Sequence, residues 1–193
     1  IMNKADFFVT YIPHDSGKIK IQIHSKTSVL HGSKLQDVCN TALSDLHINH
    51  GQLKVIDNGG QYFVLQARIE SAVKSAHPKL DRESLGDFKK HAQYKSDRER
   101  FRRSRLYLPG NQAKLMLNAG IHQPDAIILD LEDSVVRSEK DSARLIVRNA
   151  LRHLNFFGAE RMVRINQGGT GLKDLEAVIP HNVHLILVPK VEE

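Results

Sequence analysis

The chain has 193 residues, of which 40% are hydrophobic and 26% charged, and this composition is that of a globular protein. Its length allows one or two domains, each with a hydrophobic core. A single cysteine, Cys39, excludes an internal disulfide and favours a reducing, cytoplasmic environment. No stretch reaches the roughly 18 consecutive apolar residues of a membrane span, and the first residues lack the apolar run of a signal peptide. Membrane and export roles are therefore not expected.

The formal net charge of +6 is uneven along the chain. Residues 1–80 carry nine basic and six acidic side chains, residues 81–105 carry nine and five, and residues 106–193 carry ten and eleven. The chain also has no Trp and only seven Phe and four Tyr. Because nucleic-acid binding calls for a broad basic face with aromatic side chains, no nucleic-acid partner is expected. The basic middle suits a charged linker, or a surface for an acidic partner such as a nucleotide-bearing thioester.

Residues 6–76 are predicted to form a small α+β domain. The run at 7–12 is rich in β-branched and aromatic residues, and the isoleucines at 19–23 alternate with polar residues as in a half-buried strand. Between 35 and 46, apolar residues recur at the spacing of an amphipathic helix, with Ser33 as its candidate N-cap. This helix is expected to pack on the sheet.

A hairpin and a second helix are predicted to complete this domain. Strand candidates at 53–56 and 62–65 flank Asp57-Asn58-Gly59-Gly60. Asn-Gly is a strong hairpin signal because both central turn residues tolerate positive φ. The second helix is expected over about 67–76, before Pro78.

A polar, basic stretch with few apolar positions follows, and it is predicted to be a helical linker. We therefore expect a domain at 1–78, a basic helical linker at 79–102 and a second domain at 103–193.

In the second domain, strands and helices are predicted to alternate. Alternation at this spacing is typical of parallel β/α units. Reactive side chains in such units gather where the strands end and the following loops begin. The expected strands are 106–108, 126–129, 162–165 and 184–188, and the expected helices are 113–119, 138–154 and 172–179.

An acidic cluster follows the second of these strands. The apolar run 126–129 leads directly into Asp130, Glu132 and Asp133. Carboxylates at such an edge can hold a hydrated divalent cation or bind a cationic group. Alternatively, they act as an N-cap and as favourable first-turn charges for the next helix.

Two cations occupy the equivalent positions of the next strands. Arg164 lies one residue before the expected end of its strand, and Lys190 follows the last strand, ahead of the two C-terminal glutamates. An arginine at a strand end must be paired or bound to an anion. The simplest alternative to anion binding is pairing with Glu132 and Asp133.

Six ordered segments of the second domain resemble signatures of the citrate lyase β subunit, within the citryl-CoA/malyl-CoA lyase group of the HpcH/HpaI aldolase superfamily. The resemblance implies a TIM (β/α)8 barrel of roughly 250 residues, of which this chain supplies only the first four strands. The chain is therefore expected to be incomplete. The segments are RSRLYLPGN (103–111), DLEDSV (130–135), EKDSAR (139–144), VRIN (163–166), GLKDLEAV (171–178) and LVPKVE (187–192).

Residues 6–76 are similar, less closely, to the citrate lyase γ subunit, a small acyl carrier protein. The similarity lies in Asp6-Phe7-Phe8 and in the segments 25–32 and 66–72. That family attaches its prosthetic group to a serine just before this Asp, whereas Lys4 stands at the position here. No phosphopantetheine-type attachment is therefore expected on this carrier-like α+β domain.

The resemblance implies a lyase that splits a 3-hydroxy acyl thioester, citryl or malyl, into an acetyl-type thioester and an α-keto acid by retro-Claisen cleavage. The thioester belongs to CoA or to a carrier protein. Arg164 corresponds to the substrate-binding arginine and is also expected to act in catalysis. Arg103, near the CoA-side entrance, and Lys190 are expected to bind substrate.

The resemblance also implies Mg²⁺ in the complete barrel. Glu132 and Asp133 are expected to act in catalysis by orienting the hydrated metal. The Glu and Asp that bind the metal directly are expected beyond Glu193, so no metal ligand is expected within this chain.

The expected partners are further copies of the chain, or the subunits of a citrate lyase-type complex, in the cytoplasm. The alternative is a catalytically incomplete fragment or assembly module that lacks the metal ligands. This alternative has a physical basis, because four parallel strands leave an open sheet edge.

Overall fold

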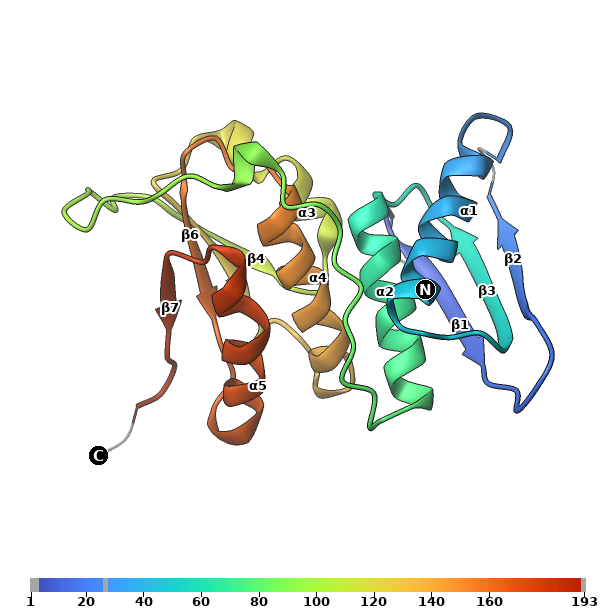
Figure 1. Ribbon diagram of the computed structural model, residues 1–193. Helices are drawn as coiled ribbons and strands as arrows, with labels where there is room; N and C mark the ends of the chain where they lie inside the picture. Colours follow the sequence, from blue (N-terminus) through green and yellow to red (C-terminus); the bar gives the residue numbers. More distant parts are fainter. Residues whose placement is uncertain (1–3, 26–27, 192–193) are drawn as a thin grey trace. The chain divides into compact units, whose positions relative to one another are not determined.

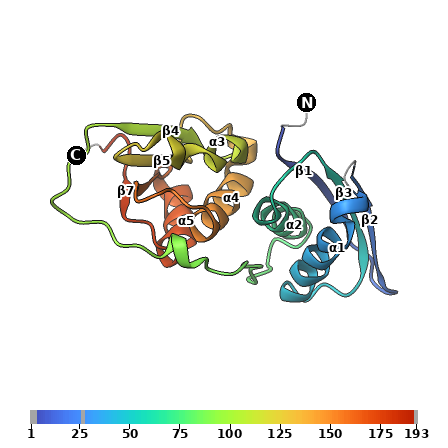
Figure 2. The same cartoon turned by 90° about the horizontal axis from the view of Figure 1, so that it is seen from above.

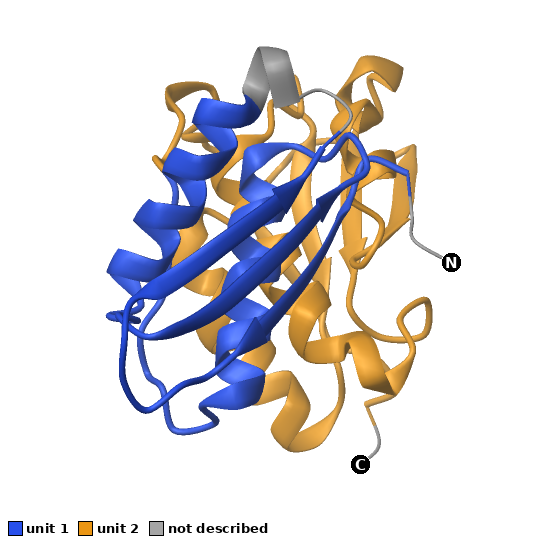
Figure 3. Ribbon diagram, turned by 90° about the vertical axis from the view of Figure 1, so that its right-hand side faces the viewer, with its two compact units in different colours: residues 1–86 blue, residues 87–193 orange. Residues whose placement is uncertain are grey.

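The computed structural model describes residues 4–25 and 28–191 (Figure 1). The chain divides into two compact units, residues 1–86 and 87–193, shown in different colours in Figure 3. We call them unit 1 and unit 2 and describe each by itself.

Unit 1 is a two-layer α/β fold. Its sheet has the order β1-β3-β2, and the central strand β3 (Gly51–Asp57) pairs antiparallel with β1 (Phe7–Ile12) and parallel with β2 (Ile19–His24). Both helices, α1 (Ser28–Asp45) and α2 (Tyr62–Ala76), lie on the same face of this sheet (Figure 2). The layer between them buries apolar side chains that include Leu35, Cys39, Leu43, Leu53, Val55, Leu65 and Ile69.

The hairpin predicted around Asp57-Asn58-Gly59-Gly60 is wrong. Asp57 ends β3 and the chain bends at Asn58 and Gly59, with Gly59 at φ 81°, but Tyr62–Leu65 begin α2 instead of a strand. The reason is that β3 already pairs with a strand on each side, so it has no free edge for a hairpin partner. Phe63, Val64 and Leu65 are all buried in the first turns of α2.

The N-cap role predicted for Ser33 is also wrong. Helix α1 begins at Ser28, so Ser33 lies inside the helix and is exposed. The apolar periodicity correctly predicted the helix but not where it begins.

The helix predicted over 79–102 is wrong as well. Apart from one 3₁₀ turn, η1 (Lys90–Ala92), this segment is irregular. Its part in unit 2, residues 87–102, bonds to other parts of that unit. The backbone carbonyl of Tyr94 accepts hydrogen bonds from the side chains of Asn182 (3.0 Å) and His184 (2.9 Å). These bonds, made to side chains distant in sequence, replace the i→i+4 bonds that a helix would use.

Unit 2 contains the predicted alternation of strands and helices. Its sheet has the order β4-β5-β6-β7, with every neighbouring pair parallel. This confirms the predicted α/β class, whereas closure into a barrel stays a prediction. The strands are β4 (Arg105–Pro109), β5 (Ala126–Asp130), β6 (Glu160–Arg164) and β7 (Leu185–Leu187); the helices are α3 (Ala113–Leu117), α4 (Lys140–His153) and α5 (Gly168–Val178), with 3₁₀ turns η2 (Ala119–His122), η3 (Arg137–Glu139) and η4 (Ile179–His181).

The core of unit 2 surrounds β5. All five residues of this strand are buried, as expected for a parallel strand covered on both faces. Helix α4 buries Ala143, Ile146, Val147 and Ala150 along one side. Within the described ranges, no helix is both long and apolar enough to cross a membrane.

Candidate functional site

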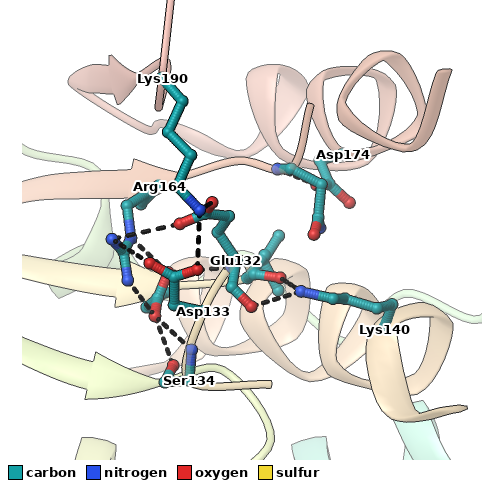
Figure 4. Close-up of polar contacts among 10 residues, drawn as sticks. Glu132, Asp133, Ser134, Lys140, Arg164, Asp174 and Lys190 are labelled. Carbon is teal, nitrogen blue, oxygen red and sulfur yellow. Dashed lines mark hydrogen bonds and ion pairs between the residues drawn. The ribbon is translucent and has the colours of Figure 1, made fainter. Parts of the chain in front are cut away.

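An ion-pair cluster lies at the carboxyl ends of β5, β6 and β7 (Figure 4). We call Asp130, Glu132, Asp133, Arg164 and Lys190 the carboxyl-end cluster. Asp130 and Arg164 are the last residues of β5 and β6, and the parallel register places them directly opposite each other. Arg164 Nε donates to Asp130 Oδ1 at 2.7 Å and Nη2 donates to Oδ2 at 2.8 Å, a bidentate pair.

Asp130 is the buried anchor of the cluster, with 1% of its surface exposed. Besides Arg164, it accepts bonds from the backbone amides of Glu132 (2.9 Å) and Ser134 (3.1 Å) and from the Ser134 hydroxyl. Burial by itself would raise the pKa of Asp130, but these hydrogen bonds, that of Arg164 foremost, outweigh it and lower the pKa to about 2. Asp130 is therefore a carboxylate at neutral pH.

The remaining contacts of Arg164 are longer. Its Nη1 lies 3.2 Å from Glu132 Oε2 and 3.3 Å from Asp133 Oδ2. Lys190 Nζ lies 2.8 Å from Glu132 Oε1 and 3.1 Å from Asp133 Oδ1. Glu132 and Asp133 therefore bridge the two cations, and the side chains of Asp133 and Lys190 are 58% and 60% exposed.

These contacts stabilise the charged forms of Arg164, Lys190 and Asp133. The hydrogen bond to Asp130 raises the pKa of Arg164 in spite of burial. Hydrogen bonds to Glu132 and Asp133 raise the pKa of Lys190. The hydrogen bond from Lys190 is the main cause that lowers the pKa of Asp133. Asp130, Asp133, Arg164 and Lys190 are thus charged at neutral pH.

The structure brings most of the predicted site residues together. Arg164, Glu132, Asp133 and Lys190 lie in one cluster, as the shared edge of parallel strands requires. Arg103 does not lie there. It precedes the first residue of β4, at the amino end of the sheet, and its guanidinium lies 4.4 Å from the centre of the Phe101 ring.

Two other predicted positions lie apart from the cluster. Lys4, at the expected attachment position of the carrier-like domain, is exposed in the turn before β1. The two C-terminal glutamates, Glu192 and Glu193, lie outside the described residues.

Sequence reasoning named the acidic run but missed which carboxylate anchors the arginine. Pairing of Arg164 with Glu132 and Asp133 was the alternative to anion binding, and both contacts are present, but the bidentate partner is Asp130. The missed signal is positional, because residues that end neighbouring parallel strands lie side by side. Tyr107 of β4 was also missed; the guanidinium of Arg164 lies 5.4 Å from the centre of its ring.

The carboxyl-end cluster does not fit a directly bound metal ion. Each of its three carboxylates is already paired with Arg164 or Lys190 or with both. Across residues 4–25 and 28–191, no group of three or more His, Cys, Asp and Glu side chains is placed to hold a metal. We therefore assign no metal ligand among these residues.

A groove of about 620 Å³ adjoins the cluster at the carboxyl ends of β6 and β7. Lys190 lines it together with Asn166, which follows β6, and with apolar side chains that include Leu172 of α5 and Val188. This volume is in the range of small-molecule sites. The groove therefore places a cation beside an apolar surface.

Family models match the two parts of the chain separately. Residues 103–193 match the HpcH/HpaI aldolase/citrate lyase family, and residues 1–76 match an acyl carrier family described as malonate decarboxylase delta subunit (MdcD). The predicted resemblance, a citrate lyase β-type domain preceded by a carrier-like domain, is thereby confirmed.

Particular relatives match about half of the chain. The chain is 43% identical over 95 residues to citrate lyase subunit beta of Haemophilus influenzae. This alignment covers 48% of this chain and 33% of the relative. It is 40% identical over 91 residues to (3S)-malyl-CoA thioesterase of Cereibacter sphaeroides, covering 46% and 32%. The chain thus spans about a third of the length of these relatives.

A solved structure also matches. The protein CitE of Mycobacterium tuberculosis, in complex with magnesium, acetoacetate and coenzyme A, is 31% identical, with a TM-score of 0.40 over 48% of this chain and 34% of that one.

Proposed function

We propose that this chain contributes the arginine-bearing part of a citrate lyase β-type active site that cleaves a carbon–carbon bond. The substrate would be a 3-hydroxy acyl thioester, citryl or malyl, and the products an acetyl-type thioester and an α-keto acid. The sequence match of residues 103–193 to the HpcH/HpaI aldolase/citrate lyase family supports the reaction class. The (3S)-malyl-CoA thioesterases among the relatives support a CoA thioester of a hydroxy acid as the substrate class.

The reaction moves negative charge between oxygen atoms. The substrate hydroxyl loses its proton and becomes the carbonyl of the keto acid as the carbon–carbon bond breaks. The bonding electrons pass to the thioester, which forms an enolate and then takes up a proton at carbon. A cation fixed beside these oxygens stabilises the charge better than water does, because it need not reorient during the reaction.

One observation carries the proposal: Asp130 holds Arg164 by two short bonds while Nη1 makes only longer contacts. The bidentate pair fixes the plane of the guanidinium. Nη1 then points to the exposed side of the cluster, where an oxygen of the substrate can replace Asp133. Lys190, on the other side of Asp133, would bind the same anionic group.

The other predicted roles are part of this proposal. Glu132 and Asp133 would hold the two cations in place before the substrate binds, and in the complete barrel they would also orient the water shell of Mg²⁺. Mg²⁺ in the complete barrel would need ligands from outside the described residues, so no step of this scheme uses it. A role for Arg103 at the entrance for CoA would require a substrate that reaches the amino end of β4. Assembly with further copies or with citrate lyase-type subunits, in the cytoplasm, completes the proposal.

A second candidate function is a structural or assembly role without catalysis. The observation in its favour is the internal ion pairing of the cluster, in which every carboxylate already contacts Arg164. In this case the cluster would only join the loops after β5, β6 and β7.

The test measures keto acid release from citryl-CoA and malyl-CoA by the full-length protein, with Mg²⁺ present. We expect Arg164→Gln to lower kcat/KM at least about a hundredfold, as for the loss of one preorganised donor to a developing oxyanion. Circular dichroism should show that the variant remains folded.

The matched control is Arg137→Gln, an exposed arginine in η3, the turn that precedes α4. It should keep wild-type turnover. Cleavage by Arg164→Gln at the wild-type rate would contradict the proposed role, and no cleavage by the wild-type protein would favour the structural candidate.

A further inference from the structure

Lys140 is a cation at an unfavourable position in helix α4. It is the first residue of α4, where the positive end of the helix dipole favours acidic side chains and disfavours cations. Its ammonium group is also partly buried, and burial lowers the pKa of Lys140 in spite of four nearby carboxylates. A cation in such a position requires compensating contacts.

The compensating contacts are made to backbone oxygens of the loop that carries Glu132 and Asp133. Lys140 Nζ donates to the carbonyl of Leu131 at 2.7 Å and to the carbonyl of Glu132. Figure 4 shows Lys140 reaching this loop from α4. The ammonium therefore binds two consecutive carbonyls of the segment that forms the acidic side of the cluster.

The same two residues are held through their amides. Leu131 N–H donates to the carbonyl of Arg164 at 2.9 Å, and Glu132 N–H donates to Asp130 Oδ1 at 2.9 Å. With Lys140 on both carbonyls, the backbone N–H and the backbone C=O of both Leu131 and Glu132 are hydrogen-bonded. This fixes the direction in which the Glu132 side chain leaves the loop toward Arg164 and Lys190.

From this geometry we infer that Lys140 is a positioning residue: it orients the loop 131–133 so that Glu132 and Asp133 hold Arg164 and Lys190 in their working positions. Lys140 itself does not contact the cations. The catalytic consequence rests on the proposed function, whereas the positioning of the loop does not.

The first experiment needs no activity. Hydrogen exchange of the amides of Leu131 and Glu132 is compared between the wild-type chain and Lys140→Met. We expect exchange at least about tenfold faster in the variant, because the loop loses both bonds to its carbonyls. Lys173→Met, an exposed lysine on α5, is the matched control and should leave these amides unchanged. Unchanged exchange in Lys140→Met would overturn the inference.

The second experiment measures kcat and KM in the full-length protein. We expect Lys140→Met to lower kcat about tenfold and to change KM less than about threefold, because a misplaced guanidinium stabilises the transition state poorly. If Lys140→Met exchanges faster but the wild-type protein cleaves neither thioester, the positioning role of Lys140 is supported and the proposed function is rejected.

A chemical rescue separates positioning from a general loss of stability. In Lys140→Cys, reaction with 2-bromoethylamine restores an ammonium at lysine length, whereas iodoacetamide adds an uncharged group. Cys39 is fully buried, so the folded chain should react at position 140. We expect the aminoethylated protein alone to recover slow exchange and kcat. Equal recovery with iodoacetamide, or none with 2-bromoethylamine, would overturn the inference.

Discussion

Asp130 and Arg164 show how two residues define the geometry of the carboxyl-end cluster. A buried carboxylate with two arginine bonds, two amide bonds and one hydroxyl bond has little freedom to move. The arginine it holds is then a preorganised cation at the edge of the sheet. Asp133, in contrast, is exposed on the outer side of both cations.

The low pKa of Asp130 predicts how stability depends on pH. Its pKa is about 2 in the folded protein and 3.8 in the unfolded chain, so the unfolded state binds more protons between these values. The stabilisation is complete above about pH 4 and is lost as the pH falls through about 2. Asp130→Asn should therefore lower the free energy of unfolding at pH 7 by about 2 kcal/mol. Below about pH 4, the free energy of unfolding of the variant should fall less steeply with decreasing pH than that of the wild type.

Urea unfolding of both proteins at pH 7 and at pH 3 measures this effect. Asp133→Asn is the matched control, since the carboxyl group of Asp133 is largely exposed, and the stability of this variant at pH 7 should stay close to that of the wild type. A stability of Asp130→Asn equal to that of the wild type at pH 7 would contradict the assignment of Asp130 as the anchor.

At the scale of elements, the structure differs from expectation where the contacts are distant in sequence. The polar composition of residues 87–102 predicted a helix, yet in unit 2 this segment is irregular apart from the 3₁₀ turn η1. Arg102 pairs with buried Glu160, with its Nη2 2.8 Å from Oε1, and the Tyr94 hydroxyl donates to the carbonyl of Ala159 at 2.5 Å. The composition of a segment indicates its local preference for helix or loop, but it does not indicate which distant residues the segment will bond to.

Helix α5 provides a test of packing against helix propensity. Alanine favours a helix over glycine by about 1 kcal/mol, yet a Cβ at Gly171 would lie 2.1 Å from the carbonyl oxygen of Asn166. Gly171→Ala should therefore destabilise unit 2 by about 2 kcal/mol in spite of the better propensity.

The control in the same helix is Gly169→Ala, whose Cβ would meet nothing within 4 Å. It should be neutral or stabilising by about 0.5 kcal/mol. Thermal unfolding of both variants measures the contrast. Equal effects of the two substitutions would show that the close approach of α5 to the loop after β6 does not require glycine at position 171.

At the scale of the whole molecule, the two units differ in what the comparisons establish. Unit 2 contains the whole match to the HpcH/HpaI aldolase/citrate lyase family, and unit 1 contains the match to an acyl carrier family. The candidate site lies entirely in unit 2. The carrier-like unit has Lys4 where the resemblance expects the serine that holds the prosthetic group.

This substitution predicts that the carrier-like unit is unmodified. Intact-mass spectrometry of the chain purified from its source should show the mass of the polypeptide, without a phosphopantetheine-type addition. The amine of Lys4 cannot replace the serine hydroxyl that forms a phosphodiester. An added mass located by fragmentation in unit 1 would contradict the prediction.

The amino-acid sequence by itself determined the order of strands and helices in unit 2 and the positions of Glu132, Asp133, Arg164 and Lys190 at strand ends. It could do so because apolar periodicity is local and because parallel strands share their carboxyl edge. Only the tertiary structure decided that Asp130 anchors Arg164 and that Lys140 binds the acidic loop. These facts depend on strand register and on contacts between distant segments, which local preference does not encode.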